Sequence, residues 1–170
     1  PLGIYTEQWL GPALKVPVRV QAIDFDLDGD LDLPVAVMGQ LLPTNDKIGS
    51  IVILENDGQQ NFSSHVVADG IARVTDVRGG DMDGDGDIDL VVGQFGYYEG
   101  ETRWMENLGH WKFKTHILQS LSGPIHTIPV DVDNDGDLDI VSLVSQEWEE
   151  IWVFENKGAG QFKAHSIWGS

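Results

Sequence analysis

An aspartate-rich window of nine residues occurs three times in this chain, and it constrains the fold more than any other feature. The windows span residues 24–32, 81–89 and 131–139, and their first residues are 57 and 50 residues apart. Each window carries Asp at positions one, three, five, seven and nine, with Gly at position six. Repetition at this interval predicts a row of similar supersecondary units, each packed against its neighbours.

Each aspartate window is followed by a second element with its own fixed spacing. Glu-Asn-x-Gly occurs at residues 55–58, 106–109 and 155–158, and a Phe lies four residues beyond each glycine. Three residues after each Phe comes a histidine, namely His65, His116 or His165. Because every repeat fills this slot in the same way, we expect the histidines to pack or hydrogen-bond within the framework rather than to act as bases.

The segments around these elements predict strands. Runs rich in β-branched residues precede the windows at residues 16–23, 71–77 and 125–132, and others follow them at residues 31–38, 88–92 and 138–144. The Asn-x-Gly elements predict turns that join a third strand to a fourth. No segment shows sustained helical periodicity with caps. Each repeat is therefore expected to be a four-stranded antiparallel unit of about 50 residues, the size of a propeller blade.

The fold class predicted is all-β, with three propeller-type blades and one additional strand at the N-terminus. We place the blades at residues 15–69, 70–122 and 123–170, and interpret residues 1–14 as the trailing strand of a preceding blade. Propellers close with about four to eight blades, and an open array leaves strand edges exposed. We therefore expect the array to be part of a larger β-propeller, or to be completed by assembly with other chains.

The windows concentrate negative charge in a way that favours bound cations. Fifteen of the 28 acidic residues lie in them, and the formal net charge of the chain is −18. Five carboxylates within nine residues repel one another unless a cation lies among them. Three divalent ions would change the net charge from −18 to −12.

Calcium suits these windows because it takes six to eight oxygen ligands from flexible loops, whereas magnesium demands tighter octahedral geometry. We expect positions one, three and five to share the ion and the glycine at position six to allow a sharp turn. The carbonyl of position seven and the carboxylate of position nine would complete the shell. The candidate ligand residues of the three calcium sites are Asp24, Asp26, Asp28, Asp30, Asp32, Asp81, Asp83, Asp85, Asp87, Asp89, Asp131, Asp133, Asp135, Asp137 and Asp139.

Two other interpretations of the windows are weaker. The aspartates could form solvated turns without a metal, but the full pattern recurs three times. An EF-hand loop shares the opening spacing but requires a bidentate Glu at position twelve, where this chain has Val35, Val92 and Ser142. The first window is the least typical, because Leu27 stands where the others have the small Gly84 and the polar Asn134.

Composition excludes several classes of function. The strongly negative charge disfavours nucleic acid as a partner. No apolar run reaches the roughly 20 residues of a membrane-spanning helix, so no membrane span is predicted. Cysteine is absent, which rules out disulfides, thiolate zinc sites and a cysteine nucleophile.

With the aspartate windows and the Glu-Asn-x-Gly elements together, the chain resembles the FG-GAP/VCBS repeat family, found in integrin α-subunit propellers and many bacterial secreted proteins. The resemblance covers residues 4–168, although the longer connection at residues 40–49 departs from the pattern. It implies a β-propeller with calcium in the loop between the first and second strands of each blade. It also implies an extracellular, cell-surface or periplasmic location and a role in binding, adhesion or scaffolding.

No catalytic signature accompanies the repeats, since Gly-x-Ser-x-Gly, phosphate-loop and His-Glu-x-x-His motifs are all missing. We therefore interpret the chain as a non-enzymatic, calcium-stabilised scaffold for a protein or carbohydrate partner. The alternative is a fragment or subunit of a secreted propeller enzyme, such as one that degrades polysaccharides. An enzyme would show a non-repeating cluster of acids, bases or arginines on the face opposite the calcium loops.

The connections between second and third strands differ most between repeats, at residues 40–49, 95–101 and 146–150. In an antiparallel blade they lie at the end opposite the calcium loops and the Asn-x-Gly turns. Variable loops on a rigid scaffold usually carry binding function, and Tyr and Trp are frequent binding hot spots. The candidate partner-binding residues are Trp9, Tyr97, Tyr98 and Trp148, with His126 expected nearby; otherwise these loops are solvated tips.

Overall fold

The structure is a computed structural model that describes residues 7–146 and 149–169. Within these ranges the chain forms three four-stranded antiparallel sheets and no helix, which confirms the all-β prediction. Accordingly, the described residues include no helix that is long and apolar enough to cross a membrane.

Each sheet takes its four strands in chain order from one edge to the other. The first sheet contains β1 (Pro17–Val20), β2 (Leu33–Val37), β3 (Gly49–Asn56) and β4 (Phe62–Ile71). The second contains β5 (Val74–Gly80), β6 (Asp89–Gln94), β7 (Glu101–Asn107) and β8 (Phe113–Gln119). The third contains β9 (Pro124–Val130), β10 (Asp139–Ser145), β11 (Glu149–Asn156) and β12 (Phe162–Trp168).

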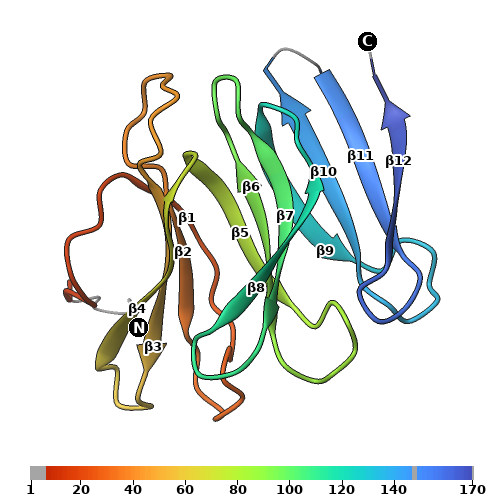
Figure 1. Ribbon diagram of the computed structural model, residues 1–170. Coiled ribbons are helices and arrows are strands. Elements are labelled where there is room, and N and C mark those ends of the chain that lie inside the picture. Colours follow the sequence, from red (N-terminus) through yellow and green to blue (C-terminus); the bar gives the residue numbers. More distant parts are fainter. Residues whose placement is uncertain (1–6, 147–148, 170) are drawn as a thin grey trace, which may run out of the picture.

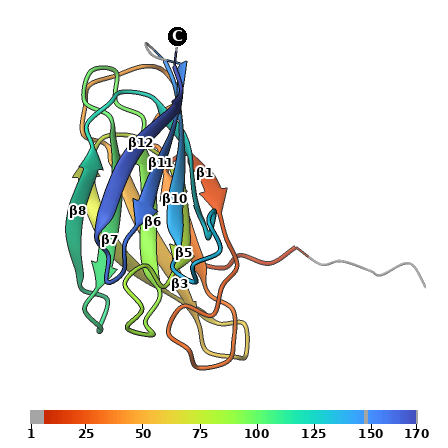
Figure 2. The ribbon, with the colours of Figure 1, turned by 90° about the vertical axis from the view of Figure 1, so that its right-hand side faces the viewer.

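The three sheets stand side by side like propeller blades, with the second between the other two (Figure 1). The described part of the chain is an open row, because the first and third sheets do not meet to close a ring. Seen from the side, β8 lies at one edge of the molecule and β1 at the opposite edge (Figure 2). The first strands β1, β5 and β9 form the inner side of the row, where β5 contacts both β1 and β9.

The core lies between neighbouring sheets, and β6 shows how the sequence builds it. Every residue of this strand is buried, because both of its faces are covered. Leu90 and Val92 belong to the cluster shared with the first sheet, while Val91 belongs to the cluster shared with the third. This alternation follows from the two-residue period of a strand. The continuous apolar run therefore marks a strand that is covered on both sides.

Two adjacent glycines let the inner strand β5 approach both neighbouring sheets. A Cβ atom on Gly79 would lie 2.9 Å from side-chain atoms of Ile23 and Ile88. A Cβ atom on Gly80 would lie 2.9 Å from Leu138. Any larger residue would therefore push a neighbouring side chain away.

The structure modifies two details of the predicted organisation. No strand forms over residues 7–14, and residues 1–6 lie outside the described ranges. Instead, Leu10 and Leu14 pack on a cluster at the outer face of the first sheet, because apolar burial there needs no strand pairing. The boundary between the first two blades also shifts, since β4 continues past residue 69 and Ile71 still pairs with Gly49.

The two ends of the row carry different connections, as the sequence predicts. The aspartate windows and the Asn-x-Gly turns lie together at the lower end in Figure 1. The connections between second and third strands lie at the upper end. One end is thus formed by repeated elements and the other by elements that differ between blades.

Candidate metal centres

Each aspartate window connects the first and second strands of its sheet. The position-six glycines have φ values of 98° to 101°, a conformation that glycine adopts without steric cost. Their N–H groups donate to the position-one aspartates at 3.1–3.2 Å. The turn therefore folds back on its first carboxylate and brings later aspartates toward it.

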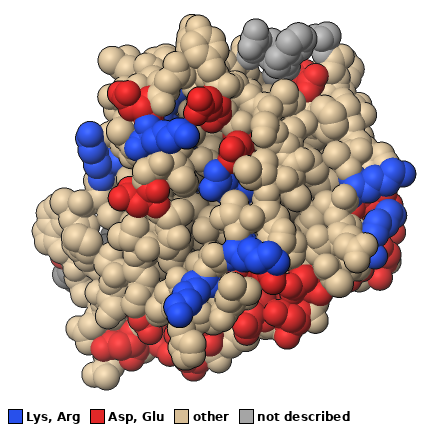
Figure 3. All heavy atoms as spheres, viewed as in Figure 1, with Lys and Arg blue, Asp and Glu red and all other residues tan. Residues whose placement is uncertain are grey.

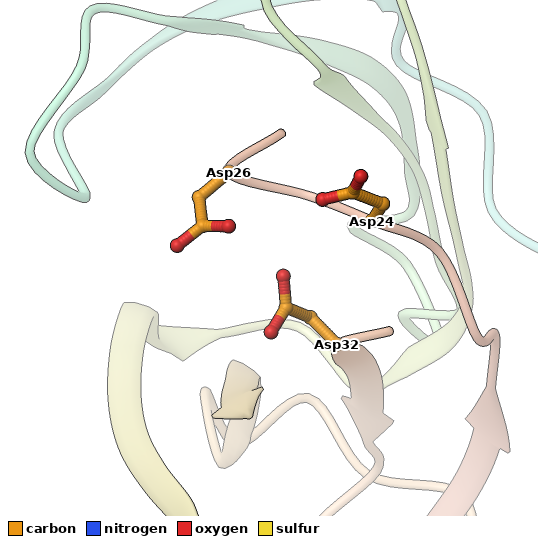
Figure 4. Close-up of side chains that lie close together, drawn as sticks. All are labelled: Asp24, Asp26 and Asp32. Atoms are coloured by element: carbon orange, nitrogen blue, oxygen red, sulfur yellow. The ribbon is translucent and has the colours of Figure 1, made fainter. Parts of the chain in front are cut away.

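The turn brings three carboxylates together in each loop, with one oxygen from each lying within 4.8 Å of the others. In the first and third loops these come from positions one, three and nine, and in the second loop from positions one, three and five. Figure 4 shows the first group, whose side chains point toward a common space. The groups are Asp24, Asp26 and Asp32; Asp81, Asp83 and Asp85; and Asp131, Asp133 and Asp139.

The remaining aspartates of the windows lie outside these groups. Asp28 and Asp135 accept the backbone N–H two residues further on, at 3.1 and 3.0 Å, as Asp85 of the second group also does at 2.9 Å. Such local bonds shape a turn without a metal. The other candidate ligands outside the three groups are Asp30, Asp87, Asp89 and Asp137.

The position-nine aspartate fastens each loop to the neighbouring Asn-x-Gly turn. Asp32 is fully buried, and its carboxylate accepts the N–H groups of Phe25 at 3.0 Å and Asn56 at 2.7 Å. Asp89 and Asp139 accept the equivalent two N–H groups at 2.7–3.1 Å. We call this arrangement the loop clasp. It explains why the aspartate window and the Glu-Asn-x-Gly element recur together, a link that sequence spacing alone does not reveal.

The electrostatics of the loops favour a cation. Burial raises the pKa of Asp26, Asp83 and Asp133 above the ordinary value, and neighbouring carboxylates raise it further. Burial also raises the pKa of Asp89 to about 6, against the opposing effect of its hydrogen bonds. Figure 3 shows acidic side chains gathered along the lower edge, where the loops lie. A divalent cation would reverse this mutual destabilisation.

The donor set fits a hard divalent cation. Each group supplies only carboxylate oxygens, the ligand type that calcium prefers. In the first loop, Oδ1 of Asp24 and Oδ1 of Asp30 are buried and accept no hydrogen bond from the described residues. Buried polar atoms normally have a partner. Asp24 belongs to the first group, so an ion bound there would supply a partner for its Oδ1. A bound calcium would neutralise charge and cross-link the loop.

A repeated glutamate beside each loop has no role in the predicted ligand set. Glu55, Glu106 and Glu155 each pair with the histidine of their own blade, at 2.5, 2.6 and 2.9 Å from its Nε2. Each glutamate also raises the pKa of the position-three aspartate nearby. The sequence contained a signal for this pair, because the glutamate of Glu-Asn-x-Gly and the histidine ten residues later recur in every repeat. The glutamate lies on the third strand and the histidine on the adjacent fourth strand.

The histidines and two tryptophans also join blades. His65 of the first sheet stacks on Trp111 of the second, with ring centroids 4.3 Å apart. Trp104 stacks on His116 and meets Phe162 of the third sheet edge-on. The framework role expected for these histidines is consistent with both contacts.

At the opposite end, hydrogen bonds join the variable connections into one surface. The N–H of Tyr98 donates to Asn45 Oδ1 at 3.2 Å, and the side chain of Gln146 donates to the carbonyl of Tyr97 at 3.3 Å. The two tyrosine rings meet edge to face with centroids 4.5 Å apart. Tyr98 is 72% exposed and Tyr97 40% exposed. Residues from all three blades thus surround an exposed aromatic pair, which we call the tyrosine surface.

The structure places Trp9 away from the tyrosine surface. Trp9 is highly exposed, but the adjacent Gln8 hydrogen-bonds to Gln60 in the β3–β4 turn. This turn lies at the end of the molecule that carries the aspartate windows, which we call the metal end. His126 lies on the inner strand β9. Trp148 lies outside the described residues.

A cleft of about 270 Å³ opens beside the first metal group, between the first loop and the β7–β8 turn. It combines acidic side chains with an aromatic wall, and solvent reaches it at the metal end. Its lining includes Phe25, Asp26, Leu27, Glu55, Asp87 and Trp111.

Comparison with known proteins identifies the repeats. A family model described as FG-GAP-like repeat matches residues 24–92 and again residues 81–142. The two matches together span more than half of the chain and include all three aspartate windows. No curated protein matches the chain by sequence.

Proposed function

The chain belongs to the FG-GAP-like repeat family, and from this premise we propose that it is a calcium-stabilised scaffold that binds a protein or glycan partner. Each aspartate loop binds one calcium ion, and the rigid blades present the tyrosine surface at the opposite end. In this proposal the module binds its partner and catalyses no reaction on it.

Calcium binding is supported by the convergence of three carboxylates in each loop and by the buried, unpaired oxygen of Asp24. The clasp holds each loop against the sheet before an ion arrives, because its hydrogen bonds use backbone N–H groups. An ion would then stabilise an already folded loop.

The observation that carries partner binding is the tyrosine surface. Exposed aromatic side chains backed by a hydrogen-bonded loop network lose little conformational freedom on binding. Tyr97 and Tyr98 meet both conditions, since their backbone atoms are tied to Gln146 and Asn45. Trp148 lies outside the described residues and stays a candidate by its place in the sequence, two residues after Gln146.

The proposed location is extracellular, cell-surface or periplasmic. Calcium sites of extracellular modules bind with dissociation constants of about 10⁻⁴ to 10⁻³ M, so three modest sites fill where calcium is abundant. A partner at such a location would be a glycan or an exposed protein.

The partner test is a binding screen on immobilised glycans and purified extracellular glycoproteins in millimolar calcium. We expect the triple variant Tyr97→Ala, Tyr98→Ala, Trp148→Ala to lose binding to whichever probe the wild type retains. Leu108→Ala is the control, because Leu108 is an exposed apolar residue in the β7–β8 turn at the metal end. Melting curves in calcium should be nearly the same for all three proteins.

Retention of binding by the triple variant, or its loss in Leu108→Ala, would contradict the assignment of the surface. If the protein cleaves a bound polysaccharide, measured as new chain ends, the propeller-enzyme alternative would be favoured over the scaffold proposal.

A further inference from the structure

One slot on the inner strands carries three different ionisable residues. It lies five residues before the first aspartate of each window and is occupied by Arg19, Asp76 and His126. These residues belong to β1, β5 and β9, the first strands of the three sheets. The slot is ionisable in all three repeats, although its residue type changes from arginine to aspartate to histidine.

A β-bulge directly precedes the slot in every sheet. The pairing register shifts between Pro17 and Arg19, between Val74 and Asp76, and opposite the step from Pro124 to His126. A bulge inserts one residue, bends its strand and redirects the next side chain. The same device therefore aims all three slot residues away from the regular pleat.

The three slot residues meet at the carboxylate of Asp76, which is fully buried. Oδ1 lies 3.3 Å from Nε of Arg19 and accepts a hydrogen bond from Nε of Arg78 at 3.0 Å. Oδ2 lies 3.4 Å from Nδ1 of His126 and accepts the N–H of Thr127 at 3.1 Å. One buried carboxylate thus orients two guanidinium groups and an imidazole from three blades.

These groups carry a net positive charge in a chain of formal net charge −18. Two guanidinium groups and one carboxylate leave a charge of +1 when the imidazole is neutral. The side chains of Arg19, Arg78 and His126 are 35%, 20% and 52% exposed, whereas that of Asp76 is inaccessible. A ligand approaching the inner strands would therefore meet the cationic groups and not the carboxylate.

Much of the hydrogen-bonding capacity of these cations is unused by the protein. An arginine offers five N–H donors, yet Arg19 donates no hydrogen bond to the described residues and its Nε is buried without one. Among the described residues, Arg78 donates a hydrogen bond only through Nε, to Asp76. If Asp76 served only to hold the blades together, one buried cation would be enough to pair with its carboxylate. A second guanidinium group and a half-exposed histidine would not be needed.

We propose that Arg19, Arg78 and His126 form a binding site for a monoanionic oxyanion group, a carboxylate or a sulfate ester, with Asp76 as the positioning residue. The guanidinium fork matches the paired oxygens of such groups. The charge of +1 matches a single negative charge, whereas a phosphate monoester carries about −1.5 to −2 at neutral pH. This site shares no residue with the tyrosine surface, and its proposal does not depend on partner binding there.

The test uses four sugars that share one hexose frame: glucuronate, glucose 6-sulfate, glucose 6-phosphate and glucose. Each is titrated into the calcium-loaded protein while the imidazole signals of the five histidines are followed by NMR. His126→Gln assigns the signal of His126 by its loss. We expect glucuronate or glucose 6-sulfate to shift the His126 signal in a saturable way and glucose to leave it unchanged.

Variants locate the site. Arg19→Gln and Arg78→Gln should each weaken the response about tenfold, because each removes hydrogen bonds to a charged group. Lys163→Gln is the control, since it changes the net charge equally but lies on the third sheet's last strand, β12. Arg78→Lys keeps the charge but not the fork, and should weaken binding less than Arg78→Gln.

The wild-type titration decides the proposal even if an arginine variant fails to fold. The proposal is overturned if neither monoanion shifts the His126 signal, or if glucose shifts it equally. A response to glucose 6-phosphate stronger than to both monoanions would overturn the assignment of ligand charge. Equal loss of binding in Lys163→Gln would show that attraction is general and that these residues form no site.

Discussion

The first and third aspartate loops share one backbone path but differ at position four. Leu27 and Asn134 occupy this position with φ values of 64° and 62°, in the left-handed region that asparagine tolerates better than leucine. The N–H of Asn134 donates to Oδ1 of Asp131 at 2.7 Å. In the first loop the corresponding Oδ1 of Asp24 is buried and has no partner in the described residues. The second loop resembles the third, with a glycine at position four.

The difference shows what fixes the shape of the loops and what fixes their stability. Both loops carry the same clasp, with Asp32 and Asp139 fully buried, so the path is set from the sheet and the adjacent turn. The residue at position four then adds or removes local strain. The first loop therefore has less stability of its own and should depend more on its ion.

Removal of calcium from all loops should have the largest effect. At one hundred times the dissociation constant, which is about 10–100 mM calcium for the affinities proposed above, one site stabilises the native state by about 2.7 kcal/mol and three independent sites by roughly 8 kcal/mol. For a chain of this size the melting temperature should fall by about 15–30 °C in excess chelator, and calcium should restore it. Calorimetry measures the shift, and an unchanged melting temperature in chelator would contradict calcium binding by the loops. During a calcium titration the first loop should fill last.

Breaking the clasp should have the next largest effect. Asp139→Ala removes the acceptor of the buried N–H of Asn156 and of the partly buried N–H of Val132, at a cost of about 1–3 kcal/mol for the buried group and less for the other. Asp32→Ala should cost the same when both are measured by urea unfolding in chelator, because the clasp is alike in the two loops. Asp139→Asn retains one acceptor oxygen and should cost less. A much smaller loss of unfolding free energy for Asp32→Ala would show that the clasp does not stabilise the two loops equally.

Exchanging the residues at position four should have the smallest effect, with opposite signs in the two loops. Leu27→Asn should stabilise the protein by about 1 kcal/mol, because it relieves a left-handed conformation that is costly for leucine. Asn134→Leu should destabilise the third loop by a similar amount. Urea unfolding in chelator separates this effect from metal affinity. If the two changes have the same sign, strain at position four is not what distinguishes the loops.

The sequence predicted the blades, the loops and the two ends because each of these is repeated. Three copies of the window and of Glu-Asn-x-Gly fix which segments are strands and which are turns. It did not predict the clasp, because the bond from the N–H of Asn56 to Asp32 joins residues 24 apart and depends on strand pairing. It also did not predict that His126 lies beside Asp76. The contact of His126 with Asp76 depends on how β9 packs against β5.

The composition of the metal groups was predicted only in part. Positions one and three converge in every loop, as spacing implies, but position five joins only in the second loop. All three position-five aspartates accept the N–H two residues ahead, so this local bond does not decide which of them joins a group. Identical residues in the three windows therefore differ in the placement of their side chains, which the repeated sequence does not encode.

The glycine pair of β5 makes the three repeats unequal despite their common plan. Where the second repeat has Gly79 and Gly80, the first has Ala22 and Ile23 and the third has Pro129 and Val130. Ile23 projects into the space left open at Gly79, and Leu138 and Pro129 close over Gly80. If two blades were exchanged, large side chains would clash at one interface between sheets and a void would form at another. The repeats are therefore an ordered series in which each unit has a single permitted place.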